Sequence, residues 1–496
     1  MSTNPVDYAD IQGLVRFGYR SLIQASFLLL QIRDRRAAGE WLTTAPISSA
    51  VDVGKAPQTA LQVAFTRQGL EALGVPDSVV AGFSDEFLSG MWKPENRSRR
   101  LGDVGSSAPE AWDWGGPNDV PHVLVMAYAQ SGLDGFLESV KGTSWDTAFK
   151  VIRSLGTSYL GGFEPFSFSD GISQPMLDWE QRRTTGDQLT YTNISCLGEF
   201  LFGYPNEYGH YTDRPLLPSD STNSSLAEAE DAPGMRDLGR NGTYLVLRTL
   251  QQDVRGFWQF VNDAAGGDSR LREQLASAMV GRTRAGEPLA PLSDAPIPGV
   301  KAGTPSNQFT YDSDENGMRC PFGAHVRRSN PRNADFPPGT SGLLSKLAHD
   351  LGLTHVEYRQ DIMSPTRFHR LLRRGREYGP PLSPEQALQP DYPDNEEHGL
   401  HFICLNANIS RQFEFVQGAW IMSSKFDGMT GETDPLLGNR QPLANGQSTN
   451  SFLLPQEGGP ARRVAGVPPF ITVRGGAYFF LPGIRALKFL ASAYSR

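Results

Sequence analysis

One histidine lies in a segment rich in arginine and proline, where it could ligate a metal ion or a heme. The segment runs from Arg319 to Arg332, reads R-C-P-F-G-A-H-V-R-R-S-N-P-R, and places this histidine at position 325. Neutral imidazole is the commonest metal ligand among protein side chains. A single histidine is more often a hydrogen-bonded structural residue, so this segment alone leaves both interpretations of His325 open.

Two further segments carry residue types that could move or stabilise charge. The first, Ser167 to Pro175, reads S-F-S-D-G-I-S-Q-P and places Asp170 before Gly171. Glycine lets the backbone turn tightly and approach a planar ligand, although an ordinary Asx turn would explain the same residues. The second, Arg373 to Pro380, reads R-R-G-R-E-Y-G-P. Such an arginine run is typical of a solvated face or of an edge that binds carboxylates.

Together these three segments resemble the signature of the dye-decolorising peroxidases. The resemblance extends from the early D-I-Q-G at 10–13 to the late R-G-G-A-Y-F-F-L-P at 474–482. It implies two ferredoxin-like halves, a bound heme b, and a reaction in which hydrogen peroxide oxidises dyes, phenols or similar one-electron donors. One residue departs from the family: its aspartate turn usually opens with glycine, whereas this chain has Ser167, whose Cβ restricts φ.

The resemblance also implies how the work is divided among the motif residues. His325 is expected to ligate the heme iron, and Arg332, in the N-P-R tail, to pair with a heme propionate. Asp170 is expected to move a proton between the two peroxide oxygens, while Arg373 stabilises the negative charge on the departing oxygen. Only the family pattern, an arginine before a short turn ending in Tyr-Gly or Phe-Gly, selects Arg373, with Arg374 as the alternative.

Five other residues receive roles from the same resemblance. Glu414, in R-Q-F-E-F, is expected to accept the ring N–H of the ligand histidine, although a surface glutamate on an amphipathic helix fits equally. Leu400 and Phe402 alternate along a strand and so share one side, which would form the wall of a small apolar peroxide pocket. Bulky donors could not enter it. Tyr378 and Trp420 are therefore candidate electron relays, although core packing would also explain Trp420.

Other candidate ligands have weaker settings. His369 and His401 lie near the motif segments and are the rivals of the candidate ligand histidine. The remaining histidines lack a comparable setting: His122, His210, His349, His355 and His398. Hard oxygen ligands for a cation such as manganese could come from an acidic cluster, although acidic loops usually only solvate. Its members are Asp391, Asp394, Glu396 and Glu397.

Short strands that alternate with helices are expected to position these segments. Expected strands cover 21–32, 61–65, 123–129, 243–250, 400–405, 470–473 and 477–480, and expected helices cover 33–43, 67–73, 133–140, 254–264, 411–416 and 484–493. The pattern predicts an α+β fold, which the resemblance extends to antiparallel sheets with heme between sheet and helices. The expected parts are an N-terminal ferredoxin-like domain over 1–168, a linker carrying the aspartate turn over 169–240, and a C-terminal ferredoxin-like heme-binding domain over 241–496.

Composition indicates an ordinary globular protein. The 496 residues are 39% hydrophobic and 20% charged with a net charge of −8, which disfavours disorder and a nucleic-acid surface. No apolar run approaches the roughly 20 residues that span a bilayer, and the start lacks a signal-peptide pattern, so no membrane partner and a cytoplasmic location are expected. Three spaced cysteines predict no disulfide framework, and the absence of C-x-x-C-H predicts non-covalent heme.

Two other functions remain compatible with the motifs. A heme-binding or transport protein could use the aspartate and the arginine only to hold the cofactor. A related heme protein could release iron from heme, since similar folds host different chemistry.

Overall fold

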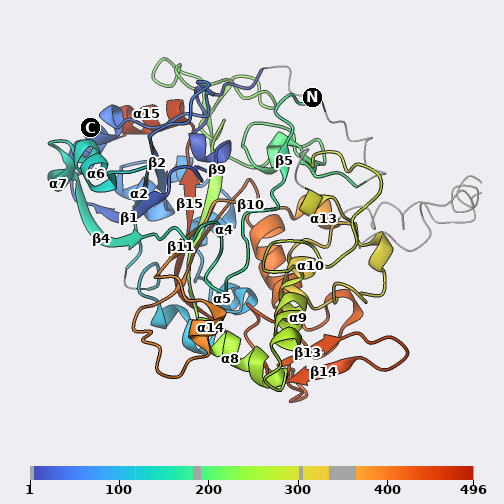
Figure 1. The fold of residues 1–496 in the computed structure, drawn as a ribbon. Coiled ribbons are helices and arrows are strands. Elements are labelled where there is room, and N and C mark those ends of the chain that lie inside the picture. The colour runs from blue at the N-terminus through green and yellow to red at the C-terminus, as the bar shows by residue number, and fades with distance from the viewer. Residues whose placement is uncertain (1–4, 118, 183–190, 301–304, 334–364, 495–496) are drawn as a thin grey trace, which may run out of the picture.

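An antiparallel sheet forms the centre of the computed structural model, which describes residues 5–117, 119–182, 191–300, 305–333 and 365–494 (Figure 1). Its strand order is β10-β12-β9-β15-β2-β3-β1-β4, and β11 also pairs with β12. The strands are β1 (Gln24–Ile32), β2 (Thr59–Phe65), β3 (Val123–Ala129), β4 (Phe149–Gly156), β9 (Thr243–Gln252), β10 (Leu372–Arg373), β11 (Arg376–Tyr378), β12 (Gly399–Asn406) and β15 (Ile471–Leu481).

The sheet has two halves with the same strand order. Across the N-terminal half the order is β4-β1-β3-β2, and across the C-terminal half it is β15-β9-β12-β10. When the four strands of each half are numbered in chain order, they lie side by side in the order 4-1-3-2. This is the ferredoxin-like arrangement. The halves meet where Phe480 of β15 lies opposite Phe65 of β2. The fold is therefore α+β with two ferredoxin-like halves, as the sequence predicts.

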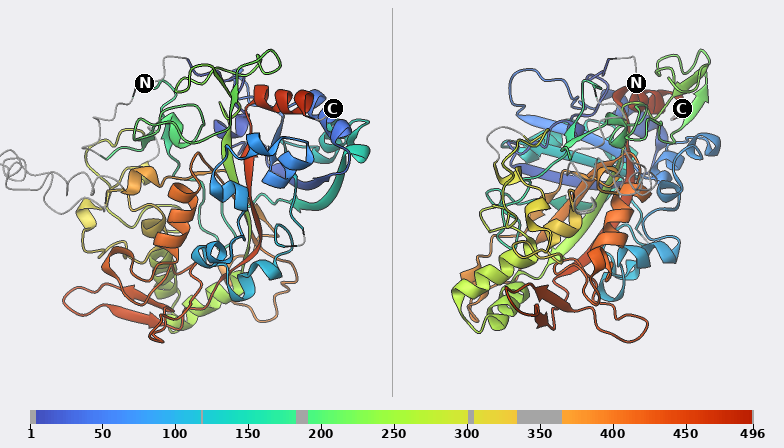
Figure 2. Two further views of the ribbon diagram at one scale, coloured as in Figure 1. Left: turned by 180° about the vertical axis from the view of Figure 1, so that it is seen from behind. Right: turned by 90° about the vertical axis from the view of Figure 1, so that its right-hand side faces the viewer.

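In the N-terminal half, helices pack directly on one face of the sheet. Alternation along the strands turns Leu28, Val63 and Val125 towards these helices. The main helices here are α1 (Arg35–Thr44), α2 (Arg67–Ala72), α6 (Leu133–Lys141) and α15 (Ile484–Ala493). Although α15 ends the described chain, it packs beside α1 near the other end (Figure 2). Little space remains on this side.

In the C-terminal half, the covering helices stand away from the same face of the sheet. They are α8 (Val254–Ala264), α9 (Ser269–Val280), α10 (His325–Ser329) and the π-helical segments Ser410–Glu414 and Val416–Ile421, drawn in orange near the centre of Figure 1. A π-helix adds a residue to each turn, changes which side chains share a face, and is frequent at functional sites. The space under this layer is the cavity described below.

Smaller elements complete the fold. The short helices are α3 (Asp77–Val80), α4 (Asp85–Ser89), α5 (Glu95–Leu101), α7 (Trp145–Ala148), α13 (Pro365–Phe368) and α14 (Pro384–Ala387). The short strand pairs are β5 (Met176–Leu177) with β6 (Ile194–Ser195), β7 (Leu216–Pro218) with β8 (Met235–Asp237), and β13 (Ser451–Leu454) with β14 (Arg462–Ala465). Among the described residues, no helix has the length and apolar character needed to cross a membrane.

Two elements differ from the sequence expectation. The helix expected over 411–416 belongs to the longer π-helical segments. The strands expected over 470–473 and 477–480 are parts of one strand, β15, which has a bulge between Val473 and Gly475. Gly475 and Gly476 interrupt the strand-forming pattern because glycine has low strand propensity, and a bulge tolerates it.

Candidate active site

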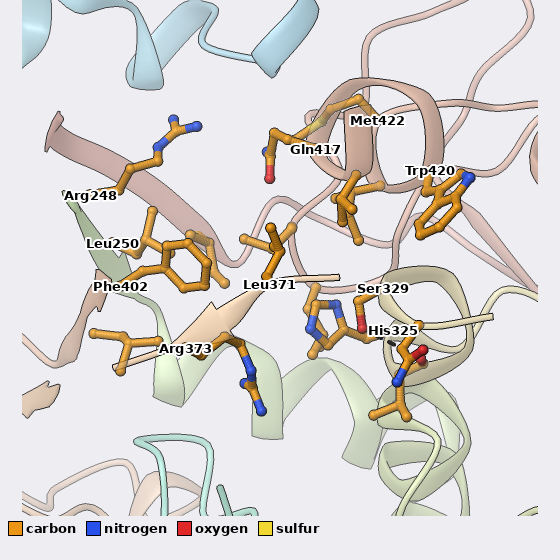
Figure 3. A pocket seen from close by; sticks show the side chains of 18 of the residues that line it. Arg248, Leu250, His325, Ser329, Leu371, Arg373, Phe402, Gln417, Trp420 and Met422 are labelled. Atoms are coloured by element: carbon orange, nitrogen blue, oxygen red, sulfur yellow. Dashed lines mark hydrogen bonds between the residues drawn. The ribbon is translucent and has the colours of Figure 1, made fainter. Parts of the chain in front are cut away.

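A cavity of about 470 Å³ lies between the C-terminal half of the sheet and its covering helices (Figure 3). Its size is within the roughly 300–1,000 Å³ typical of ligand and cofactor pockets. Arg373 and Phe402 reach it from the sheet, and His325 faces it from α10. Seven residues selected from the sequence line this one cavity: Asp170, His325, Arg332, Arg373, Leu400, Phe402 and Trp420. Glu414 and Tyr378 do not line it.

His325 is held by a buried carboxylate. Its Nδ1 donates to Oδ2 of Asp434 at 2.9 Å, and Oδ1 of Asp434 accepts the backbone N–H groups of Leu436 and Leu437 at 2.9 and 2.8 Å. Burial alone would raise the pKa of Asp434, but the interaction with His325 outweighs it and holds the pKa below its usual value. No described residue forms a hydrogen bond with Nε2 of His325, so this nitrogen can ligate a metal.

The prediction that Glu414 is the partner of His325 is wrong. Glu414 forms ion pairs with Arg97 at 2.9 Å and Arg100 at 3.1 Å, and accepts the hydroxyl of Tyr478 at 2.9 Å. The π-helical segments direct neighbouring side chains to the cavity and this carboxylate away from it. The sequence carried one signal for the correct partner: Asp434 precedes Pro435 and two leucines, a pattern typical of an Asx turn.

On the opposite wall, Asp170 and Arg373 form an ion pair. The distance from Arg373 Nη1 to Asp170 Oδ1 is 3.2 Å, and the backbone N–H of Arg373 donates to Oε1 of Gln174 at 2.9 Å. Burial would raise the pKa of Asp170, but the charge of Arg373 and the N–H of Gly171 outweigh it and lower the pKa. Asp170 is therefore a carboxylate at neutral pH and can accept a proton.

The turn that carries Asp170 forms without the expected glycine. Ser167 adopts a φ of +72°, in the left-handed region that favours glycine, and Gly171 has a φ of +68°. The residue that departs from the family pattern thus has a backbone conformation that glycine adopts at lower cost. The turn still points Asp170 into the cavity.

Arg374 is not the arginine that faces the cavity. Its Nε and Nη2 donate to the carbonyl oxygens of Leu14 and Val15, at 2.7 and 2.9 Å. Burial lowers the pKa of Arg374 to about 10. Arg374 follows the last residue of β10 and points to the opposite side from Arg373, so of these two arginines only Arg373 lines the cavity.

Two arginines form a cationic end of the cavity. Nη1 of Arg332 donates to the carbonyls of Asn307 and Phe309, and Nη1 of Arg282 to those of Gly286 and Ser306. Neither guanidinium forms an ion pair with a described carboxylate. Burial, with the charges of Arg332 and Arg373, lowers the pKa of Arg282 to about 10. This end of the cavity therefore suits the carboxylates of a ligand.

The rival histidines have less suitable surroundings. His401 lies on the other face of β12, and its ring nitrogens bond to Thr249 Oγ1 at 3.2 Å and to the carbonyl of Gly156 at 3.1 Å. His369 lines the cavity, but its Nδ1 donates to a backbone carbonyl, that of Arg411, and burial lowers its pKa to about 4. Of the histidines without a comparable setting, His349 and His355 lie outside the described residues.

Tyr378 and Trp420 lie in different places. Trp420, only 7% exposed, lines the cavity on the same side as His325. Tyr378 stacks on His401 with ring centroids 4.6 Å apart, on the sheet face away from the cavity. Its hydroxyl is buried without a described partner, and burial raises its pKa.

The acidic loop does not form a metal site. Asp394 pairs with His398 at 2.6 Å, and Glu397 pairs with Arg474 at 2.8 Å. Across the described parts of the chain, no group of three or more His, Cys, Asp or Glu side chains could hold a metal ion. Two of the four suggested manganese ligands, Asp394 and Glu397, are thus engaged in ion pairs.

The chain is similar in sequence to named dye peroxidases. The chain is 32% identical over 455 residues to the multifunctional dye peroxidase DyP2 of Amycolatopsis sp., covering 87% of this chain and 82% of the relative. It is 28% identical to the dye-decolorizing peroxidase AauDyP1 of Auricularia auricula-judae, covering 96% and 86%.

Solved structures agree on the fold. A fungal DyP-type peroxidase from Auricularia auricula-judae superposes with a TM-score of 0.71 at 24% identity, covering 99% of this chain and all of that one. A dye-decolorizing peroxidase solved with 2,6-dimethoxyphenol gives 0.70 at 23% identity, covering 99% and 100%. No family model matches the chain.

Proposed function

The chain belongs to the dye-decolorizing peroxidases, which are heme enzymes, and from this premise we propose that His325, Asp170 and Arg373 carry out its peroxidase reaction. Oxidation of dyes, phenols or similar one-electron donors by hydrogen peroxide is the activity that this assignment explains. The names of the relatives support dyes as donors, and the 2,6-dimethoxyphenol complex of a protein with the same fold supports phenols.

The cavity fits heme b in its chemistry. Nε2 of His325 is available as the iron ligand, and Asp434 accepts the Nδ1 proton, which makes the imidazole a stronger electron donor. The cationic end formed by Arg282 and Arg332 suits the propionates. Apolar side chains, among them Leu250, Leu400 and Phe402, supply the remaining contact surface. When bound, heme supplies the redox centre that takes electrons from the donor and delivers them to peroxide.

The protein's own contribution is proton movement and charge stabilisation. Asp170 accepts a proton from one peroxide oxygen at its carboxylate and returns it to the other, acting first as base and then as acid. Arg373 remains charged throughout and stabilises the negative charge that develops on the departing oxygen. Their ion pair keeps Asp170 ionised between cycles, because the guanidinium lowers its pKa.

Bulky donors need a route that does not enter the peroxide pocket. Leu400 and Phe402 form the sheet wall beside Arg373 and keep that pocket small. Trp420 is the better supported relay, because it lines the cavity near His325. Tyr378 is less directly placed, since it lies on the other face of the sheet. Changing either residue to Phe and comparing a bulky dye with a small phenol would rank the two.

The observation that carries the proposal is the convergence of His325–Asp434 and Asp170–Arg373 on one cavity. The test is to purify the protein with heme, record its absorption spectrum, and measure dye oxidation with and without peroxide. Peroxide-dependent dye oxidation with many turnovers is expected. A protein that retains heme but does not oxidise any donor would instead support a heme-binding or transport role. Release of iron from heme would support the other alternative, a heme protein that removes the iron.

A further inference from the structure

A second carboxylate, Glu164, organises the turn that carries Asp170. One of its oxygens, Oε2, accepts the backbone N–H of Phe166 at 3.0 Å, and the other, Oε1, accepts that of Phe168 at 3.0 Å. The backbone N–H of Glu164 donates to the carbonyl of Phe168 at 2.9 Å, and that of Asp170 donates to Gly162 at 3.0 Å. The Glu164 side chain thus closes the loop from which Asp170 projects.

Gln252 connects this loop to the sheet. It is the last residue of β9, and its Nε2 donates to Oε2 of Glu164 at 2.9 Å. Both side chains line the cavity. The other amide atom, Oε1 of Gln252, is buried and has no hydrogen-bond donor among the described residues. A buried carbonyl oxygen without a donor is unfavourable, so this arrangement lacks one proton.

A proton on Glu164 would complete the arrangement. A carboxylic acid and a primary amide pair at two points, with amide N–H donating to one acid oxygen and acid O–H donating to the amide oxygen. The first of these bonds is present. Protonation at Oε1 would supply the second to Gln252, while both acid oxygens could still accept the loop N–H groups of Phe166 and Phe168.

The electrostatic surroundings favour the neutral acid. Burial is the largest effect and raises the pKa of Glu164 to about 7, although the bonds from Gln252, Phe168 and Phe166 oppose it. The charged or titratable groups that interact with Glu164 are Asp170, whose charge raises this pKa further, and His325 on the opposite wall. Two nearby carboxyl groups with pKa values displaced in opposite directions are typical of an acid–base site.

We propose that Glu164 is a positioning residue that holds the Asp170 turn in place as a protonated carboxyl, and that loss of this proton limits the reaction at high pH. This inference rests on the proposed function. Ionised Glu164 would add a second negative charge beside Asp170. That charge opposes the negative charge that develops on the departing peroxide oxygen, so the reaction with peroxide slows above neutral pH.

Three variants of the heme-loaded enzyme test the proposal through the rate of reaction with peroxide as a function of pH. Glu164→Gln keeps the shape of the neutral acid and cannot ionise, so it should react like the wild type at low pH and keep its rate above about pH 7. Glu164→Ala releases the turn and should be slower at every pH, by roughly 10²-fold. The matched comparison is Glu377→Gln, which removes another carboxyl near Asp170 that does not bond to the turn, and because Glu164 is still present this variant should still lose rate above about pH 7.

Thermal unfolding gives a readout that does not depend on activity. A carboxyl whose folded pKa is raised contributes stability that is fully present below its unfolded pKa and is lost as pH rises through the folded pKa, here between about 4.5 and about 7. The unfolding temperature of Glu164→Gln relative to the wild type should therefore increase from about pH 5 to about pH 8. The difference should be absent if Glu164 is ionised throughout.

Several outcomes would overturn the proposal. One is a Glu164→Gln variant that loses rate over the same pH range as the wild type. Another is a Glu164→Gln variant that fails to fold or is as slow as Glu164→Ala, because a neutral side chain of the same shape should replace a protonated glutamic acid without loss. A wild-type enzyme that does not react with peroxide at any pH would contradict the proposed function instead, and the unfolding comparison would still report the proton on Glu164.

Discussion

The two walls of the cavity hold their ionisable pairs in different ways. On the helix wall, Asp434 is fully buried and both of its oxygens are engaged, one by His325 and one by two backbone N–H groups. On the sheet wall, the side chains of Arg373 and Asp170 are 37% and 29% exposed, and their contact is longer, 3.2 Å against 2.9 Å. The carboxylate is therefore fixed and buried on the helix wall, where only the His325 ring is partly exposed, whereas both members of the pair on the sheet wall are accessible.

This difference matches two chemical tasks. A metal ligand must keep its orientation and its tautomer, which a buried and saturated carboxylate enforces. Groups that meet a small molecule and exchange a proton with it need open positions and a carboxylate that can be protonated and deprotonated. Substitutions that change one wall at a time separate the two tasks.

Removal of His325 should abolish heme retention. His325→Ala leaves the helix wall without an iron ligand, so the purified variant should contain little heme and show an altered absorption spectrum after reconstitution. Heme content per protein and the ferric spectrum measure this. His369→Ala, which removes the other cavity histidine, is the control and should keep its heme. Wild-type heme content and spectrum in His325→Ala would show that another residue is the ligand.

Removal of Arg373 should slow the reaction but leave heme in place. Arg373→Leu deletes a preorganised donor from a desolvated site, which typically costs about 2.7–4 kcal/mol of transition-state stabilisation, or on the order of 10²–10³ in rate. Steady-state dye oxidation at saturating donor measures it. Arg374→Leu is the matched comparison, and it should lower the unfolding temperature while keeping the rate. Equal losses of rate in both variants would count against a special role for Arg373.

Asp434 and Glu414 should separate cleanly. Asp434→Asn weakens the acceptor of the His325 Nδ1 proton, and such changes typically cost about 10–100-fold in metal affinity or activity. The heme reduction potential should rise, because the histidine becomes a weaker electron donor. Glu414→Gln should leave the potential unchanged and affect only stability, since its partners are Arg97 and Arg100. A reduction potential that changes in Glu414→Gln and not in Asp434→Asn would show that Glu414, not Asp434, is the partner of His325.

The smallest effect concerns the strained turn of the sheet wall. Ser167 has a φ of +72°, and a side chain in this region costs roughly 1–2 kcal/mol. Glycine avoids this cost but loses more conformational entropy on folding, which offsets part of the gain. Ser167→Gly should therefore stabilise the protein by about 0.5–1 kcal/mol and leave the peroxide rate unchanged. Denaturant unfolding measures the difference, with Ser167→Ala as the control. A destabilised Ser167→Gly would show that the serine side chain supports the turn.

Local patterns predicted most of the framework. Strand β3 and helices α8 and α15 have the bounds expected from their periodicity, because apolar spacing alone determines which face each element buries. The three motifs meet at one cavity because strands and turns with recognisable residues carry them. The division into 1–168, 169–240 and 241–496 remains a prediction.

Contacts between distant segments could not be predicted. Asp434 is 109 positions from His325, and nothing local to either residue links them. The choice of Glu414 failed because a π-helical turn changes which side chains face the cavity, and periodicity does not reveal such turns. Glu164 was missed for a related reason, since its partners are mainly backbone N–H groups.

The reaction of heme-loaded Asp170→Asn with peroxide, followed by stopped-flow heme absorbance, tests most directly whether the accessible wall moves the proton. The wild type should react fast, with a rate that falls as pH decreases through the lowered pKa of Asp170, since the base must be ionised. Asp170→Asn should be slower by roughly 10²–10⁴-fold, lack that step and keep its heme. A wild-type rate and pH profile in Asp170→Asn, at equal heme content, would contradict this account of the two walls.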